Sequence, residues 1–324
     1  MSIGTYSSVS SSSNEPSPQI FWGDYKKPRS SEAEVPALSG TLVQLELLMK
    51  PQTIDLELLT ALVRSDLGLT LQVLRHARSE EDGNEELWRI SDCLVHLGPR
   101  LLGLAEPLCG WSEYSDRSYA QAEAFWLHSK LVASVAEETA RYFQDLNANP
   151  EQAYLCGLLH NLNRLPRILS QVGSPGFSAD PRSIHEWVAK CNLPSFAMDI
   201  LGTDCHELNP DKLTGPARVV NFARSWIDLC LPWAETCLAR KTRFKLPLLQ
   251  AANLICKHFP DTLEDPLVPF IGMLRDATLS KLNEVRPESS SVLPRLRAAS
   301  QISASRTQRS RKTTGSLKPC NAQV

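Results

Sequence analysis

The sequence of 324 residues lacks several features that would assign it at once to a common class of protein. No apolar run approaches the roughly 18 residues that a membrane-spanning helix needs. The first residues, MSIGTYSSVSSSSNEPSP, have neither the basic nor the hydrophobic region of a secretory signal. The net charge is only −2, so the chain as a whole is not a nucleic-acid-binding polycation. These absences predict a cytoplasmic protein without a membrane anchor.

The nine cysteines are scattered singly, and no two of them are spaced as CxxC. An odd number of isolated thiols argues against a disulfide framework, and the missing pairs argue against a thiolate zinc site. We therefore expect most of these thiols to act as small apolar core residues. A Gly-rich phosphate loop, a GxSxG segment and an HExxH segment are also absent, so none of these catalytic motifs is available.

Both ends of the chain differ in composition from the middle. Ten of the first 31 residues are Ser, and the segment 1–38 is expected to be disordered. It contains an aromatic cluster of Phe21, Trp22 and Tyr25, which either packs on the protein's own domain or anchors a partner. The segment 286–324 has eight basic residues and one acid, and it is also expected to be disordered.

The basic tail has its densest charge in a short cluster, formed by Arg306, Arg309, Arg311 and Lys312. One interpretation is a solubilising tail that contacts the acidic remainder of the chain. The other is a weak contact with nucleic acid or another anionic partner. Aromatic residues for base stacking are not interleaved with these charges, so sequence-specific binding is not expected.

Between the two ends, residues 39–285 are expected to form a single domain of the all-α class. Neither an alternating strand pattern nor a repeat of 20–50 residues is found there. The best-marked helix start has Asn149 as N-cap and Pro150 at the first helical position. Another start is predicted at Ser183, with Glu186 completing a capping box. Apolar residues at helical spacing, or start signals, predict helices over about 42–49, 56–63, 69–74, 118–143, 150–162, from 183, from 194, from 216, and over 246–259 and 264–284.

Two of the seven histidines lie within apolar helical stripes. His128 lies in the long predicted helix over 118–143, and His160 lies in the next helix within the segment LCGLLHNL. A lone histidine on an apolar face is most often a hydrogen-bonded core residue. Two histidines on consecutive antiparallel helices can, however, converge on a shared pocket.

These histidine segments carry a family resemblance. The segments FWLHS at 125–129 and AYLCGLLHNL at 153–162 resemble the HD superfamily, whose members have a His on one helix and a GLLHDIG segment on the next. More specifically, the chain resembles the HDOD family, the HD-related output domains of bacterial signalling proteins. The order of three further segments supports this resemblance over about 41–240: DLGLTLQVLRHAR at 66–78, ISDCLVHLGPRLL at 90–102, and NLP at 192–194 followed by a Cys-His pair at 205–206. The resemblance implies a multi-helical HD-like bundle and a bacterial regulatory role.

The resemblance also implies that the metal site of the superfamily is degenerate here. Catalytic HD proteins hold a divalent metal with two His and two Asp, and the metal activates water against a phosphoester. His128 and His160 match the two histidines, but Asn161 stands where the Asp beside the second His is expected, and Arg224 stands at the last Asp. A neutral amide brings no charge to a hard cation, and a guanidinium repels it. Of the family's later pair of histidines only His206 remains.

Three function classes follow from these observations. The one we expect is a non-catalytic bacterial signalling module that contacts an unidentified signalling protein, with no metal or cofactor, and that receives its input and effector from separate proteins. The first alternative is a metal-dependent HD-type phosphohydrolase, and the second is a regulator that binds nucleic acid or an anionic partner through the basic tail. In the expected case, the remaining residues either hydrogen-bond one another within the packing or line a mildly cationic cleft for a small anion. These vestigial pocket candidates are His128, His160, Asn161, His206 and Arg224.

Overall fold

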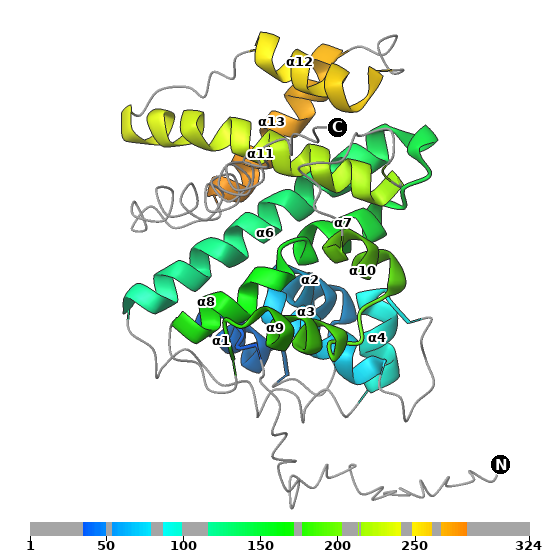
Figure 1. The fold of residues 1–324 in the computed structure, drawn as a ribbon, viewed down its shortest axis with the longest axis vertical. Helices are drawn as coiled ribbons and strands as arrows, with labels where there is room; N and C mark the ends of the chain where they lie inside the picture. The colour runs from blue at the N-terminus through cyan, green and yellow to red at the C-terminus, as the bar shows by residue number, and fades with distance from the viewer. Residues whose placement is uncertain are drawn as a thin grey trace, which may run out of the picture. The chain divides into compact units, whose positions relative to one another are not determined.

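The computed structural model describes residues 35–49, 54–78, 87–98, 116–171, 177–202, 213, 215–240, 248–260 and 267–283. Over these ranges the chain forms helices and turns without any strand, so the predicted all-α class is confirmed (Figure 1). The aromatic cluster at 21–25, the basic cluster at 306–312 and His206 lie outside the described residues, as do residues 1–34 and 286–324 of the proposed tails. Residues 35–38 of the predicted disordered segment are described, and there the prediction is wrong, because Val35 and Ala37 are buried in the apolar core. None of the described helices is long and apolar enough to cross a bilayer.

The described α-helices follow one another along the chain, and two 3₁₀ helices are found among the described residues. They are α1 (Ser39–Met49), α2 (Leu56–Ser65), α3 (Leu67–Ala77), α4 (Ile90–Leu97), α6 (Asp116–Tyr142), α7 (Pro150–Leu159), α8 (Leu165–Gln171), α9 (Pro181–Ala189), α10 (Ser195–Gly202), α11 (Gly215–Arg240), α12 (Leu248–His258) and α13 (Leu267–Asn283), with the 3₁₀ helices η2 (Gln144–Leu146) and η3 (Leu162–Arg164) on either side of α7.

The helix starts show which capping predictions were right. Asn149 caps α7 as predicted, because its side chain accepts hydrogen bonds from the amides of Glu151 and Gln152. The predicted start at Ser183 is wrong. Helix α9 begins at Pro181, and the carboxylate of Asp180 caps it by accepting a hydrogen bond from the Ser183 amide at 3.1 Å. An Asp followed by Pro is the stronger start signal, because proline at the first helical position needs no amide partner.

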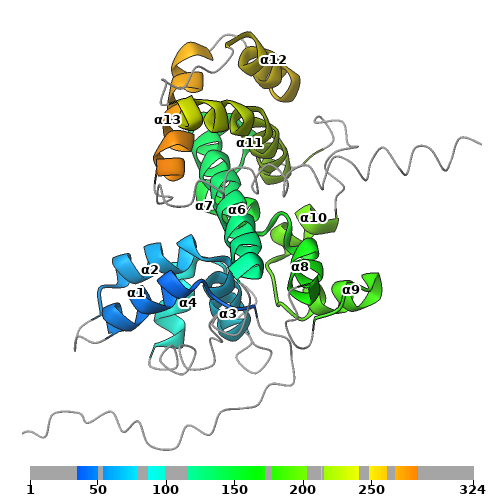
Figure 2. The same ribbon diagram turned by 90° about the vertical axis from the view of Figure 1, so that its left-hand side faces the viewer.

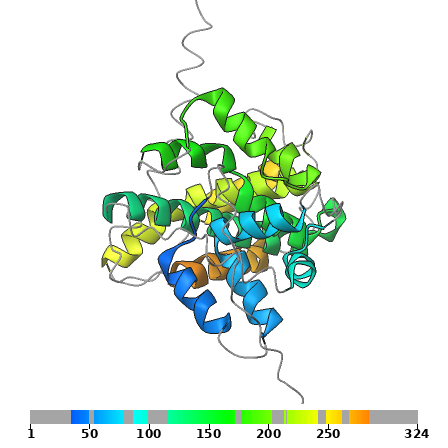
Figure 3. The same ribbon diagram turned by 90° about the horizontal axis from the view of Figure 1, so that it is seen from below.

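Helices α6 and α7 form the centre of the fold and contribute to two buried apolar clusters. One cluster joins them to α1–α4 and to the segments around α8 and α10, while the other joins them to α11, α12 and α13. Figures 2 and 3 both show α1 and α2 on the opposite side of α6 from α8 and α9. Every residue from Ala153 to Leu159 in α7 is buried, as expected for a helix that is covered on all sides.

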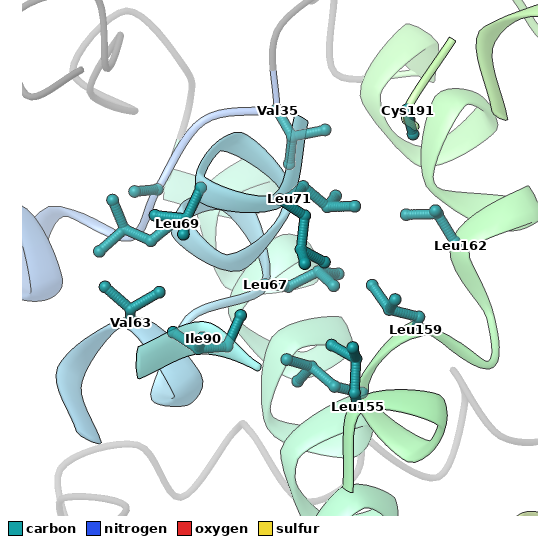
Figure 4. Close-up of a cluster of buried hydrophobic side chains, with 14 of the residues drawn as sticks. Val35, Val63, Leu67, Leu69, Leu71, Ile90, Leu155, Leu159, Leu162 and Cys191 are labelled. Carbon is teal, nitrogen blue, oxygen red and sulfur yellow. The ribbon is translucent and has the colours of Figure 1, made fainter. Parts of the chain in front are cut away.

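The first apolar cluster anchors α7 against α3. Figure 4 shows Leu155, Leu159 and Leu162 in the same buried cluster as Leu67 and Leu71 of α3. All five leucines are at most 4% exposed. This packing fixes the end of α7, where His160 lies.

Gly157 allows α7 to approach α6 closely at the level of this site. A Cβ atom added at Gly157 would lie only 2.6 Å from the Cα atom of Ala133 and 2.9 Å from its amide nitrogen. No larger residue fits without moving one of the two helices apart. This contact lies one turn before His160 on α7, and it brings the histidine-bearing parts of the two helices together.

The described cysteines behave as the sequence predicted. Cys93, Cys156, Cys191 and Cys230 are free and buried, and Cys256 is half-buried. Burial raises the pKa of the Cys93 thiol to about 11. These four buried thiols therefore act as apolar core groups rather than as nucleophiles.

Candidate functional site

The structure brings His128 and His160 into contact. His128 lies on α6 and His160 directly follows α7, and their ring centroids are 5.5 Å apart with the ring planes tilted by 40°. The side chains are buried, with exposed fractions of 3% and 9% for the two residues. The apolar spacing in the sequence predicted that the two histidines can converge, and in this fold they do.

Both ring nitrogens of His160 are engaged in hydrogen bonds. The Nδ1 atom lies 2.6 Å from the carbonyl oxygen of Gly157, and the Nε2 atom lies 2.6 Å from the Nδ2 atom of Asn161. Because a carbonyl only accepts, Nδ1 carries the proton, and the neutral ring then accepts the Asn161 amide proton at Nε2. The asparagine at the position of the expected carboxylate therefore occupies the lone pair of the second ring nitrogen of His160.

Two arginines place positive charge around the histidine pair. Burial, together with the charges of Arg224 on α11 and Arg164 in η3, lowers the pKa of His128 to about 3. Burial also holds the pKa of His160 well below its usual value, helped by His128, Arg224 and Arg164 and opposed by the Gly157 carbonyl. Both rings are therefore neutral at physiological pH, in surroundings that favour anions over cations.

His128 differs from His160 in its hydrogen bonding. Its Nε2 atom is buried and has no hydrogen-bond partner among the described residues. The cluster thus combines a satisfied pair, His160 with Asn161, and a ring nitrogen whose hydrogen-bonding capacity is unused. The hypothesis of a cleft for a small anion stays a prediction, since it concerns a ligand that the structure does not contain.

The side chains that the structure brings together at this cluster can be compared with the ligands that a metal ion prefers. Within the described ranges, no group of three or more His, Cys, Asp or Glu side chains is placed to hold a metal ion. The cluster itself supplies two imidazoles, one amide and a guanidinium, and Arg224 is only 8% exposed. This donor set does not fit a hard divalent cation.

Two polar residues with clear roles in the structure, Arg164 beside the histidine pair and Asp66 in the core, were missed by the sequence analysis. Arg164 lies four residues after His160, a spacing that could have suggested its influence on the ring. Asp66 is fully buried between α2 and α3, where its carboxylate accepts hydrogen bonds from the amides of Leu38 and Leu69 and from Nε1 of Trp126. Burial raises the pKa of Asp66, and these donors oppose the rise. An acidic residue directly before a helix is a common N-cap, and this pattern could have identified Asp66 in the sequence.

Comparison with known proteins gives one family and one similar structure. Residues 35–172 match the HDOD domain family. A solved structure described as the MmoQ response regulator from Methylococcus capsulatus str. Bath is similar with a TM-score of 0.46 and 19% sequence identity. The similarity covers 68% of this chain and 98% of that one. A search of curated proteins gave no match to this chain.

Proposed function

Because residues 35–172 of this chain form an HDOD domain, we propose that the protein is a non-catalytic signalling module of bacterial origin that acts in the cytoplasm through contacts with another protein. HDOD domains are HD-related output domains of signalling proteins. Two features are proposed for this chain: it has lost metal-dependent catalysis, and it acts by binding another protein.

The observation that carries the loss of catalysis is the hydrogen bond between Asn161 and His160. A metal ligand must present a free lone pair, and the Nε2 lone pair of His160 accepts the Asn161 amide at 2.6 Å while Nδ1 is bound to Gly157. An Asp at position 161 could instead have shared a cation with the ring. The positive charge of Arg224, which acts on both histidines, further opposes a divalent ion.

In place of metal binding, the cluster links three elements of the fold. The His160–Asn161 pair lies where α7 ends and η3 begins, and the charge of Arg224 on α11 acts on His160. The hydrogen bonds of His160 with Gly157 and Asn161 satisfy both nitrogens of this buried ring within the chain. The cluster therefore supports a role in packing.

Action through protein contacts is supported by apolar side chains left exposed on the first helices. Val43 and Leu47 lie one turn apart on α1 and are each 57% exposed, and Leu58 on α2 is 54% exposed. Several exposed large apolar residues on neighbouring helices are typical of an interaction surface.

The experiment that tests the loss of catalysis is a phosphoesterase assay on the full chain. Bis(p-nitrophenyl) phosphate and p-nitrophenyl phosphate would be supplied with manganese, iron or zinc. We expect the wild type to hydrolyse them no faster than a His128→Ala/His160→Ala variant. Turnover that requires both histidines would overturn the proposal in favour of the HD-type phosphohydrolase.

A further inference from the structure

A small hollow lies between α2, α4 and α7, on the opposite face of α7 from the described core of α11–α13. It has a volume of about 40 Å³, and Ile90, Leu155 and Leu158 form part of its lining. Figure 4 shows that Ile90 and Leu155 also belong to the buried apolar cluster. Since one water needs roughly 10–15 Å³, the hollow has room for a few non-hydrogen atoms, such as a carboxylate group, and not for a nucleotide.

The charged side chains that line the hollow are two arginines and one glutamate. Arg64 lies with its guanidinium 4.1 Å from the centroid of the Tyr154 ring and donates from Nη2 to Glu137 at 3.0 Å. Arg89 is paired with Glu151 at 3.2 Å, and both of these side chains are half exposed, at 51% and 53%. An ion pair so exposed to water contributes little to stability, so Arg89 can exchange Glu151 for another carboxylate at low cost.

The start of α4 adds hydrogen-bond donors to the same place. The N-cap residue of α4 is Arg89, which makes no side-chain hydrogen bond to the first helical turn. A guanidinium has no acceptor atom, so the Arg89 side chain cannot accept hydrogen bonds from the first backbone amides of α4. A carboxylate from outside, seated between the two arginines, would accept from these amides as an Asp N-cap does.

Exposed apolar side chains lie one helical turn from the lining residues of the hollow on both α4 and α2. Val95 lies one turn beyond Ser91 on α4 and is 64% exposed. Leu56 lies one turn before Thr60 on α2 and is 40% exposed. A ligand that fits this surface therefore combines a carboxylate with aliphatic groups on either side of it.

We propose that the hollow between α2, α4 and α7 is a docking site for an acidic, aliphatic peptide segment of a partner protein. The carboxylate of one Asp or Glu in that segment binds Arg64, Arg89 and the start of α4, and neighbouring aliphatic side chains cover Leu56 and Val95. The inference rests on the proposed function, because it identifies the kind of partner that the signalling module contacts.

The test measures binding of the full chain to an array of short, acetylated and amidated peptides that permute Glu, Leu and Ala. A second array carries Gln in place of each Glu. We expect Glu peptides to bind and their Gln counterparts to bind about tenfold more weakly or worse, as for the loss of a charged hydrogen bond. The difference should shrink as salt is raised. Equal binding to both arrays, or none, would overturn the proposal.

Two pairs of variants locate the binding. Arg89→Gln and Val95→Asp should each weaken binding of the selected peptide by about tenfold. Their controls, Arg182→Gln on α9 and Val268→Asp on α13, make the same changes at exposed positions outside the hollow and should bind as the wild type does. All four positions are exposed, and an unchanged melting temperature verifies folding.

The outcomes separate the docking site from the proposed function. Peptide binding that survives Arg89→Gln and Val95→Asp overturns this site and leaves the signalling role untouched. A concentration-dependent dimer that both variants abolish would identify a second copy as the occupant and overturn the peptide. Metal-dependent hydrolysis in the phosphoesterase assay would overturn the proposed function. Peptide binding in the array depends only on the hollow, so the two results are independent.

Discussion

At the scale of single residues, the buried histidines should make the fold sensitive to mild acid. The pKa of His128 is lowered to about 3, mainly by burial, against an ordinary value of 6.5. The unfolded chain therefore takes up a proton below pH 6.5 that the folded chain does not accept, and stability falls as the pH decreases. Between pH 7.5 and pH 5.5 this single group should lower the free energy of unfolding by about 1.4 kcal/mol.

The variant His128→Phe should lose this part of the pH dependence. Its unprotonatable ring replaces an imidazole whose Nε2 atom has no partner among the described residues, so stability at pH 7.5 should change little. Urea unfolding at the two pH values measures the difference. The variant His185→Gln is the control, because it removes an imidazole at an exposed position on α9. A His128→Phe protein with an unchanged slope would show that His128 is not held neutral in the fold.

Asp66 and Asp55 allow a comparison of the same capping interaction in buried and exposed surroundings. Asp55 caps α2 at the surface, and Asp55→Ala should cost about 1 kcal/mol. Asp66 caps α3 while also accepting from the Leu38 amide and the Trp126 indole, so Asp66→Ala leaves buried donors without an acceptor. We expect a cost of about 2–4 kcal/mol, measured by urea unfolding. Equal costs for the two variants would contradict the role assigned to Asp66.

At the scale of helices, the close contact between α6 and α7 depends on Gly157. The variant Gly157→Ala places a methyl group against the backbone of Ala133, and the strain should lower stability by about 1–3 kcal/mol. Gly272 in α13 has no atom within 4 Å of the added Cβ, so Gly272→Ala should instead stabilise by about 0.5–1 kcal/mol. Thermal unfolding of both variants tests the pair. A neutral or stabilising Gly157→Ala would contradict the close approach of the two helices.

Most of the helices could be predicted because their apolar stripes or caps are local signals. In α2, for example, Leu59, Leu62 and Val63 of the predicted apolar stripe are buried, whereas Leu56 at its start is 40% exposed. Helix α8 was missed because it directly follows η3 without a polar N-cap, so no start signal marks Leu165. The helix starting at Pro181 was misplaced because Ser183 and Glu186 imitate a capping box one turn later.

The chemistry of the site was only partly predictable from the sequence. Helical periodicity placed His128 and His160 on apolar faces, and the family resemblance identified Asn161 and Arg224 as replacements for carboxylates. The hydrogen bond between Asn161 and His160 depends on side-chain rotamers at the end of α7, which no spacing encodes. The hollow beside Arg64 and Arg89 is lined by residues from separate helices, so it could not be predicted without knowing how these helices pack.

At the scale of the whole molecule, deleting the basic tail tests the second alternative function, a regulator that binds nucleic acid through this tail. If the segment 286–324 is a solubilising tail, its deletion should leave binding to double-stranded DNA unchanged at the background level. Filter binding at low and at physiological salt measures this. Salt-sensitive binding that disappears on deletion would instead support a regulator that contacts nucleic acid through the tail.

The central claim is that the histidine cluster holds no metal, and elemental analysis tests it most directly. The full chain and its His128→Ala/His160→Ala variant would be exposed to manganese, iron and zinc, desalted, and analysed for bound metal per chain. We predict the same background level in both proteins, because Asn161 occupies the Nε2 atom of His160 and Arg224 repels a cation. Stoichiometric metal in the wild type that is lost in the variant would contradict the account.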